Sequence, residues 1–358
     1  MITWYDKTGK LLEQDVVAFR ATLLAWYDQN GRTHLPWRVD KEPYHIWISE
    51  IMLQQTQVET VIPYYERFLS ALPTVEALAN ADEAVLLKLW SGLGYYSRVR
   101  NMQKAAIQIM TEHGGIFPST AKDLQTLSGI GPYTAAAIAS ISFGEVVPAL
   151  DGNMFRVFAR LLKIDADIAQ PSSRKLFYER ILPIVDPVRP GDFNQAVMDL
   201  GTSLMRAKAE TKSESPFARF NLSYQDGTEL TYPIKTKKTK QIPKFYAAII
   251  SETSGALAYE QRPKTGLLAN FWTFPLVEFD SWDAIYDGVS AQYPDAKQLT
   301  ISPVTHLFTH QKWQVMLVQV EKVDKIQEQW TYLTDEAYDA LPQTTLQLKL
   351  QAALKEMQ

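Results

Sequence analysis

The segment Leu127-Ser-Gly-Ile-Gly-Pro-Tyr-Thr-Ala-Ala-Ala-Ile138 joins a short apolar helix to an Ala-rich one through Gly129 and Gly131. Two glycines around one apolar residue predict a tight hairpin, because glycine adopts backbone conformations that other residues avoid. The amides of such a hairpin, with the N-terminus of the next helix, can bind phosphate oxygens. A bare Gly-x-Gly is weak evidence for such a site, and a packing role in an ordinary helix connection is its more common explanation. The whole segment from Leu127 to Ile138 is a much more specific pattern than Gly-x-Gly alone.

The composition is that of a globular protein with more than one domain. The chain has 358 residues, of which 46% are hydrophobic and 21% charged, so two domains are the default expectation. It contains no cysteine, which excludes disulfides, thiolate nucleophiles and thiolate-held metals. The net charge of -4 argues against a histone-like polyanion binder, although local basic patches matter more than the total. No membrane-length apolar run or secretory signal is visible, so we expect a cytoplasmic protein without membrane association.

The pattern along the chain changes once. Apolar residues at helical spacing, interrupted by many Gly and Pro breaks, predict an all-α domain over residues 1–221. Residues 222–242 become polar and then lysine-rich, which predicts a linker. Residues 243–358 predict a smaller α+β domain. Its strand-length runs are 245–250, 257–260, 271–274 and 313–320, and its helical patterns lie near 281–292 and 335–341.

One acidic residue stands inside a core-like stretch. Glu50 lies in Trp47-Ile-Ser-Glu-Ile-Met-Leu-Gln-Gln-Thr-Gln-Val58, with apolar residues on both sides. Burial among apolar side chains raises the pKa of a carboxyl group, which suits a general acid that works near neutral pH. The simpler interpretation is a solvated position on an amphipathic helix.

Six segments occur in an order typical of one known family. They are Leu35–Arg38, Trp47–Val58, Leu89–Arg98, Leu127–Ile138, Pro148–Asn153 and Phe193–Gly201. On these segments the chain resembles the helix-hairpin-helix DNA glycosylase superfamily, and most closely its adenine DNA glycosylases, the MutY family. The resemblance implies a monofunctional glycosylase of base excision repair, which flips adenine out of the duplex and hydrolyses its bond to the sugar.

The resemblance also implies the catalytic residues. Glu50 would protonate adenine N7, while Asp151 would stabilise the oxocarbenium-like sugar electrostatically or through a transient covalent bond. Asp151 is also a candidate helix N-cap, and one residue can serve both purposes. Tyr133 would hydrogen-bond in the pocket and Asn153 would orient the catalytic groups. Related enzymes that cut the strand carry a lysine at the position of Tyr133; since tyrosine forms no Schiff base, we predict no true lyase activity.

Further residues are implied to contact substrate and DNA. Tyr95 and Gln55 match the family's wedge positions, where one side chain stacks and the other fills the space of the extruded base. Trp37 and Arg38 fall where the family lines its adenine pocket, and Gln195 lies near that pocket. Trp37 could equally be a core residue, and the alternative for Tyr95 is a partly buried core aromatic. The implied contact set also includes Thr56, Leu93, Gly129 and Gly131.

The chain departs from the family at the iron–sulfur cluster. Most relatives hold this cluster with four cysteines after the last matched segment. The corresponding residues here are Met205, Lys212, Ser215 and Asn221. Because cluster ligation requires cysteine sulfur with rare exceptions, we predict that the cluster is absent and that there is no cofactor.

The second domain resembles the Nudix-like C-terminal domain of adenine glycosylases through Leu267–Pro275 and His306–His310. It lacks the glutamate-dense helix that a catalytic Nudix hydrolase needs for metals, so we predict recognition without hydrolysis. The family inspects 8-oxoguanine with a Phe-Ser-His loop, which here reads Phe308-Thr309-His310. Thr309 keeps the hydroxyl. Two histidines without an adjacent carboxylate are more often structural than metal ligands.

The expected partner is double-stranded DNA with adenine opposite 8-oxoguanine or guanine, bound by a monomer. Two alternatives stay open. One is an endonuclease III-type glycosylase/lyase for damaged pyrimidines, which Tyr133 and the second domain disfavour. The other is a non-catalytic mismatch-binding protein.

Overall fold

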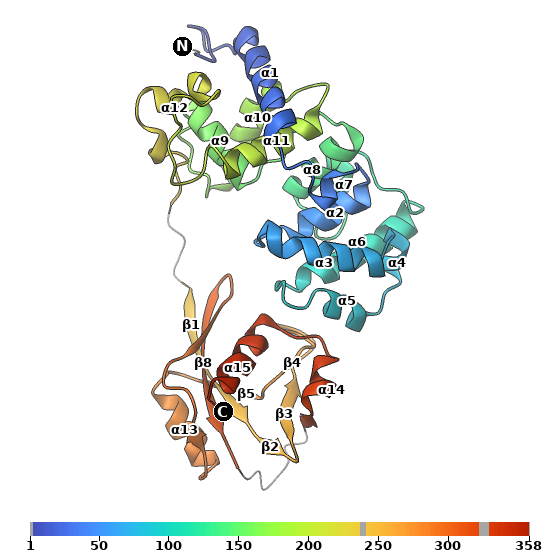
Figure 1. The fold of residues 1–358 in the computed structure, drawn as a ribbon, viewed down its shortest axis with the longest axis vertical. Coiled ribbons are helices and arrows are strands. Elements are labelled where there is room, and N and C mark those ends of the chain that lie inside the picture. Colours follow the sequence, from blue (N-terminus) through green and yellow to red (C-terminus); the bar gives the residue numbers. More distant parts are fainter. Residues whose placement is uncertain (1–2, 237–240, 322–328, 358) are drawn as a thin grey trace. The chain divides into compact units, whose positions relative to one another are not determined.

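The computed structural model describes residues 3–236, 241–321 and 329–357. The chain forms two compact units, Met1–Ala81 with Asn101–Lys237, and Asp82–Arg100 with Lys238–Gln358. Their helices and strands are labelled in Figure 1. Within the predicted linker 222–242, residues 237–240 lie outside the described residues, while residues 222–225 and 229–231 form short helices.

The first unit is helical. Its helices are α1 (Glu13–Asn30), α2 (Pro43–Met52), α3 (Val58–Ala71), α4 (Val75–Ala79), α7 (Ala121–Leu124), α8 (Pro132–Phe143), α9 (Gly152–Leu162), α10 (Pro171–Ile181), α11 (Pro190–Thr202) and α12 (Leu222–Gln225), with 3₁₀ turns η1 (Pro36–Arg38), η2 (Leu182–Ile184), η3 (Ala218–Phe220) and η4 (Glu229–Thr231). α6 (Ser97–Glu112) begins in the second unit and continues in the first. Several helices start with proline, whose fixed φ and missing N–H suit the first turn.

An aromatic core fixes α1 against α9 and α11. The ring of Phe19 in α1 makes edge contacts with Trp4, Phe158, Phe193 and Phe220, at centroid distances from 5.2 to 6.4 Å. All five side chains are fully buried. Such contacts add to the free energy gained by burial, so the N-terminal helix is held to the helices that carry the later motifs.

A buried charged network closes the end of the first unit. Arg160 of α9 is fully buried, and its guanidinium donates hydrogen bonds of 3.1–3.3 Å to the carbonyl oxygens of Arg206, Ala207, Ala209 and Tyr232. Glu229 lies 3.6 Å from Arg160 and accepts hydrogen bonds from the amide and hydroxyl of Thr211 and from Asn221 Nδ2. Because each buried polar group is partnered, the desolvation of the two charges is compensated locally.

The second unit contains two sheets. Its elements are α5 (Glu83–Leu89), β1 (Ile242–Ile250), β2 (Glu252–Thr253), β3 (Ala256–Gln261), β4 (Trp272–Thr273), β5 (Leu276–Phe279), α13 (Ala284–Gln292), β6 (Lys297–Gln298), β7 (Val304–Leu307), β8 (Gln311–Gln319), β9 (Trp330–Leu333), α14 (Asp335–Asp339) and α15 (Thr345–Lys355). One sheet has the order β5-β1-β8-β6, with β7 also paired to β8; the other has the order β2-β3-β4, with β9 paired to β3. β1 and β8 are parallel and the other pairs antiparallel.

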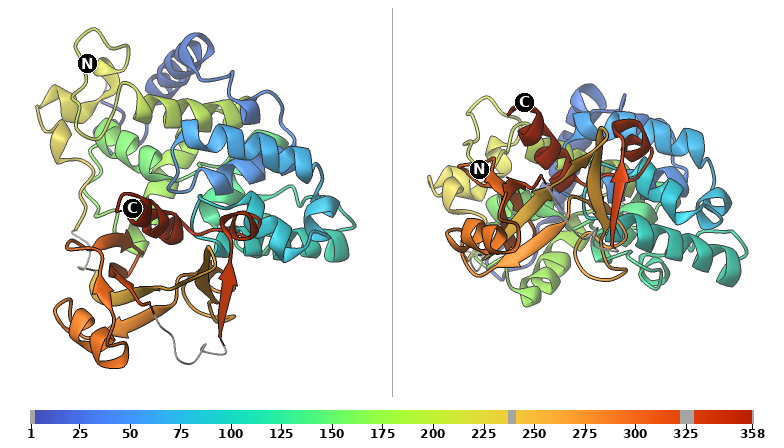
Figure 2. Two further views of the ribbon diagram at one scale, coloured as in Figure 1. Left: turned by 60° about the horizontal axis from the view of Figure 1, so that its bottom comes forward. Right: turned by 90° about the horizontal axis from the view of Figure 1, so that it is seen from below.

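Alternate residues of β1 enter two different cores. Tyr246 and Ala248 join the cluster that includes α15, whereas Ala247 and Ile249 join the cluster that includes α13. This follows from the two-residue period of a strand, and it places a helix on each face of the sheet (Figure 2). The predicted order of an all-α domain followed by a smaller α+β domain is confirmed.

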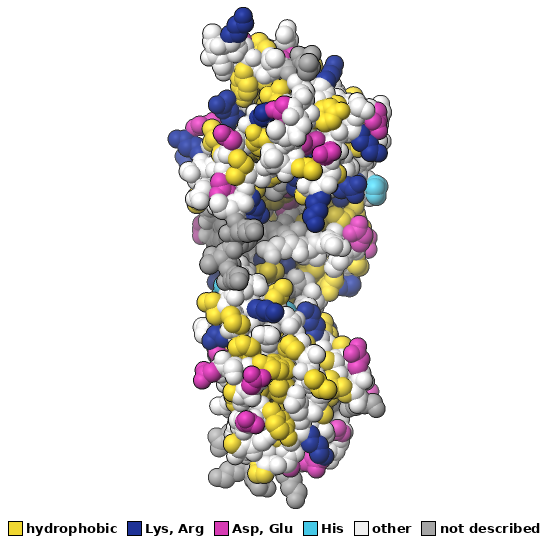
Figure 3. Space-filling model, turned by 90° about the vertical axis from the view of Figure 1, so that its left-hand side faces the viewer, with side chains coloured by type: hydrophobic (Ala, Val, Ile, Leu, Met, Phe, Trp, Pro, Cys, Tyr) yellow, Lys and Arg dark blue, Asp and Glu magenta, His cyan; other side chains and the backbone are white. Residues whose placement is uncertain are grey.

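Charged side chains of both signs are mixed on one face of the molecule (Figure 3). On the face shown in Figure 3, Lys and Arg side chains alternate with acidic, polar and apolar ones, as the small net charge suggests. Among the described residues, no helix is both long enough and apolar enough to cross a membrane.

Candidate active site

Glu50 is a buried carboxyl group on α2. Nearly every side chain from Tyr44 to Met52 is buried in this helix, and Glu50 is only 7% exposed. Burial is the main reason that the pKa of Glu50 is raised from 4.5 to about 7; the nearby Asp151 raises it further, while Tyr133 and Arg38 lower it. The sequence-based prediction of a perturbed acid therefore agrees with the local environment, and a solvated surface position does not.

Tyr133 holds one oxygen of that carboxyl group. It stands in the first turn of α8, and its hydroxyl donates to Glu50 Oε2 at 2.5 Å; its oxygen also lies 3.9 Å from Met198 Sδ. Burial and the neighbouring acids raise the pKa of Tyr133 well above its ordinary value, so the phenol keeps its proton. Since Oε2 accepts this hydrogen bond, Oε1 is the oxygen left to carry an acidic proton.

Asp151 is both a helix cap and part of the site. Its carboxylate accepts from Met154 N at 2.6 Å, which caps α9, and from Asn153 Nδ2 at 2.7 Å. Asn153 in turn accepts from Arg156 Nη2 at 2.7 Å. Burial raises the pKa of Asp151, and these hydrogen bonds oppose that rise. The structure therefore contains the helix cap, and it places the same carboxylate in the lining of a cavity.

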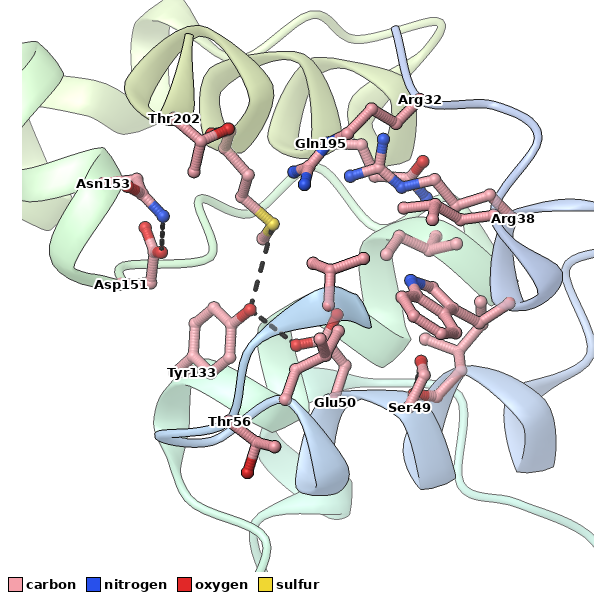
Figure 4. A pocket seen from close by; sticks show the side chains of 17 residues that line it. Arg32, Arg38, Ser49, Glu50, Thr56, Tyr133, Asp151, Asn153, Gln195 and Thr202 are labelled. Carbon is pink, nitrogen blue, oxygen red and sulfur yellow. Dashed lines mark hydrogen bonds between the residues drawn. The ribbon is translucent and has the colours of Figure 1, made fainter. Parts of the chain in front are cut away.

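The two carboxyl groups line one cavity of about 210 Å³ in the first unit. In Figure 4, Glu50 and Tyr133 lie between Asp151 on one side and Arg38 and Gln195 on the other. Predicted residues that line the cavity are Trp37, Arg38, Glu50, Thr56, Tyr133, Asp151, Asn153 and Gln195.

Two cavity residues are fixed by partners that the sequence analysis missed. Asp199 on α11 binds Arg38 at 2.7 and 3.1 Å and also binds Arg32. Burial opposes its ionisation, but these arginines keep the pKa of Asp199 below its ordinary value. Tyr27 donates to Gln195 Oε1 at 2.6 Å, which leaves the amide Nε2 of Gln195 as a donor for other groups. Neither partnership has a local sequence signal, because each joins residues more than 150 positions apart.

Trp37 has a largely structural environment. Although it lines the cavity, it is only 4% exposed and packs edge-on against Tyr65 at 5.5 Å. Most of the Trp37 side chain is therefore packed in the core, as the alternative interpretation of the sequence proposed.

Both predicted wedge residues have left-handed backbone conformations. Gln55, in the loop after α2, has φ +62° and is exposed; Tyr95, between α5 and α6, has φ +49° and is 43% exposed. Residues other than glycine rarely adopt positive φ, and such strain clusters at functional sites. Leu93, in the same loop as Tyr95, is buried.

The glycine hairpin has one position that only glycine fits. Gly129 has φ +75°, and a Cβ there would lie 2.7 Å from Asn101 Cβ. Gly131 caps α8 with φ -81° and has open space around the place of a Cβ. Ile130 between them is buried, so the turn is anchored while its backbone amides precede a helix N-terminus.

In the second unit, Phe308-Thr309-His310 connects β7 to β8. Phe308 packs edge-on against Trp313 at 4.8 Å and His306 at 4.7 Å, whereas Thr309 and His310 are exposed. Burial lowers the pKa of His306 to about 4, so it is neutral near pH 7. Over residues 3–236, 241–321 and 329–357, no three His, Cys, Asp or Glu side chains are grouped to hold a metal ion.

Comparison with known proteins places these features in a family. Residues 48–183 match the model of the HhH-GPD superfamily base excision DNA repair proteins, and residues 246–353 match a NUDIX domain. The chain is 35% identical over 360 residues to the human adenine DNA glycosylase, covering 83% of this chain and 66% of that protein. It is 33% identical to the Buchnera aphidicola (subsp. Schizaphis graminum) adenine DNA glycosylase, covering 82% of this chain and 85% of that one.

Solved structures share the fold of the first part of the chain. A thermostable thymine-DNA glycosylase superposes with a TM-score of 0.53 at 23% identity, covering 60% of this chain and 98% of that one. An endonuclease III in complex with DNA gives 0.51 at 18% identity, covering 61% and 99%.

Proposed function

The chain belongs to the adenine DNA glycosylases, a family of base excision repair enzymes, and from that premise we propose that it removes adenine mispaired with 8-oxoguanine or guanine in duplex DNA. The observation that carries the proposal is the single cavity lined by Glu50 and Asp151. N-glycoside cleavage needs one group that protonates the leaving base and one that stabilises the sugar cation. A carboxyl group with a pKa of about 7 suits the first task at neutral pH.

The reaction uses the two oxygens of Glu50 differently. Tyr133 holds Oε2, so the proton on Oε1 passes to N7 of the extruded adenine, and the bond from the base to C1′ breaks with its electron pair on the base. Asp151 faces the resulting sugar cation as a carboxylate, or bonds to it transiently. Water then adds to C1′, which breaks any transient bond to Asp151, and gives its proton to the Glu50 carboxylate. An abasic site, free adenine and the protonated Glu50 carboxyl group result.

Residues around the cavity select the base. Arg38 is held by Asp199, and Tyr27 orients the amide of Gln195, so two donors have fixed directions before a substrate enters. Adenine offers ring-nitrogen acceptors to such donors, and preorganised donors lose less entropy on binding. Trp37 and Thr56 complete this wall, and Asn153 holds the Asp151 carboxylate.

Outside the cavity, separate elements handle the duplex. We assign Gln55 and Tyr95 to the space of the flipped nucleotide, supported by their exposure and left-handed backbones. Leu93 shapes the Tyr95 loop from its buried side. The amides around Gly129 and Gly131 suit a phosphate. Exposed Thr309, with Phe308 and His310, suits inspection of the opposite base.

No iron–sulfur cluster is part of this proposal, because the residues do not fit one. Met205 is buried in the aromatic core, and the side-chain amide of Asn221 donates hydrogen bonds to Thr211 and Glu229. Lys212 and Ser215 offer no thiolate either. The Arg160 and Glu229 network occupies this region instead, and no step of the reaction runs through a metal.

The test is an assay on duplexes that carry adenine opposite 8-oxoguanine. Strand breaks that appear only after alkali support a monofunctional glycosylase acting on double-stranded DNA. Breaks without alkali support a lyase of the endonuclease III type, and tight binding without product supports a non-catalytic mismatch binder. Glu50→Gln should bind the duplex but lose at least about 10²-fold in rate. Glu59→Gln, the same change at an exposed position of α3, is the matched control.

A further inference from the structure

The loop before α6 holds Tyr95 in an unfavourable conformation. Between α5 and α6 the chain has positive φ at Gly92 (+94°), Gly94 (+69°) and Tyr95 (+49°). Glycine tolerates this region, whereas a tyrosine there has its Cβ close to backbone oxygen. Other contacts must therefore stabilise this backbone.

Arg98 supplies those contacts, with help from Trp90. Arg98 Nη2 donates to the carbonyl oxygens of Leu93 at 3.2 Å and Gly94 at 3.1 Å. Trp90 Nε1 donates to the same Gly94 oxygen at 3.1 Å. The Gly94 carbonyl belongs to the peptide that enters Tyr95, so fixing its direction fixes the plane from which the φ of Tyr95 is measured.

The guanidinium also contacts the ring that it positions. Its central carbon lies 5.7 Å from the centroid of the Tyr95 ring and 5.3 Å from that of Trp90, within reach of cation–π attraction. Arg98 stays charged near neutral pH, since burial lowers its pKa only to about 10. Tyr95 nevertheless remains 43% exposed, so part of the ring is open to a base.

We propose that Arg98 is a positioning residue, which holds the Tyr95 ring and its loop in the conformation that enters the duplex. The inference rests on the proposed function and deepens it. An aromatic wedge that is ordered before binding loses less entropy when it inserts between bases. Loss of Arg98 frees the loop to relax toward negative φ, which turns the ring away from its insertion direction.

A double-mutant cycle in the full chain separates positioning from general packing. The variants are Arg98→Met, Tyr95→Ala and their combination, with Arg98→Lys as the conservative change. Arg100→Met is the matched control, because Arg100 lies on the same helix but pairs with Glu83 at 2.6 Å. Each variant is measured for single-turnover excision, for duplex affinity, for thermal unfolding, and for the fluorescence of 2-aminopurine placed beside the target adenine.

If Arg98 acts through Tyr95, Arg98→Met lowers the excision rate and the 2-aminopurine signal at least about tenfold, and has no further effect once Tyr95 is alanine. Arg98→Lys should recover part of the loss, and Arg100→Met should behave like the wild type. Equal losses with and without Tyr95 overturn the inference, as does an unaffected Arg98→Met. Should Arg98→Met fail to fold, the same cycle is read with Arg98→Lys. A wild-type protein that binds the duplex but leaves adenine in place contradicts the proposed function instead, and the cycle is then decided on fluorescence alone.

Discussion

Replacing Tyr133 with phenylalanine should move the alkaline limb of the pH–rate profile to higher pH. The change keeps the ring on α8 but removes the hydroxyl that donates to Glu50 Oε2 at 2.5 Å. That hydrogen bond favours the ionised carboxylate and so opposes the increase in the pKa of Glu50 that burial produces. Without it, the pKa of Glu50 rises above about 7.

The size of the shift follows from the kind of hydrogen bond. A hydrogen bond to a charged group contributes roughly 1.5–3 kcal/mol, and one pKa unit corresponds to about 1.4 kcal/mol, so the limb should move by about 1–2 pH units. The sign of the shift follows from the role proposed for Glu50. As a general acid it is active when protonated, so activity is full below its pKa and is lost as pH rises through that value. A higher pKa therefore extends activity to higher pH, even where the plateau falls because the carboxyl group is less well oriented.

Single-turnover excision rates between about pH 5 and 10 measure the limb directly. Met198→Leu is the control, because it removes the other contact of the Tyr133 hydroxyl and keeps the bond to Glu50. Its alkaline limb should stay at the wild-type pH. A Tyr133→Phe profile whose limb is unmoved, or lies at lower pH, would refute the assignment of Glu50 as an acid tuned by Tyr133.

Three further predictions concern stability and DNA binding. Glu50→Gln should raise the free energy of unfolding at pH 8 by up to about 3 kcal/mol. The pKa of Glu50 is about 7 in the folded state against 4.5 in the unfolded state, so its ionised form destabilises the fold above pH 7 and hardly affects it below pH 4.5. Denaturation at pH 8 and pH 4.5 should therefore show that the stability difference between variant and wild type shrinks as pH falls. Arg160→Met should cost about 3–5 kcal/mol because it leaves Glu229 buried without its cation, and adding Glu229→Gln should recover part of that loss in urea unfolding. Gly129→Ala should lower both stability, by about 1–3 kcal/mol, and duplex affinity, whereas Gly131→Ala has room for its methyl group and should change stability little in the same measurements.

Local patterns predicted most of the fold. The strand-length runs at 245–250, 257–260 and 313–320 correspond to β1, β3 and β8, and the run at 271–274 contains β4. α15 and the strands β2, β5, β6, β7 and β9 were missed. α15 is a helix with several polar residues (TLQLKLQAALK), and its clearest signal is the Thr344 cap, which accepts from Gln347 N. The short strands owe their conformation to pairing with β1, β3 and β8, which a local pattern does not contain.

In the candidate site, too, the sequence predicted local features but not long-range contacts. The burial of Glu50 could be predicted because its apolar neighbours are adjacent in sequence, and the Asp151 cap because its acceptor role is local. The sequence could not show which groups tune these carboxyl groups. Tyr133 lies 83 positions from Glu50, so its hydrogen bond follows from the packing of α2 against α8.

In this chain, which has no cysteine, basic side chains of α9 hold the loop after α11. An iron–sulfur cluster holds a loop through several bonds to one metal centre. Here the Arg160 guanidinium donates several hydrogen bonds to backbone carbonyl oxygens instead. One turn earlier on the helix, Arg156 binds the carbonyls of Gly201 and Met205 at 2.7 and 3.0 Å. The N-cap of the same helix is Asp151. Because α9 carries all three side chains, the hydrogen bonds that hold the loop also fix the Asp151 carboxylate relative to α11.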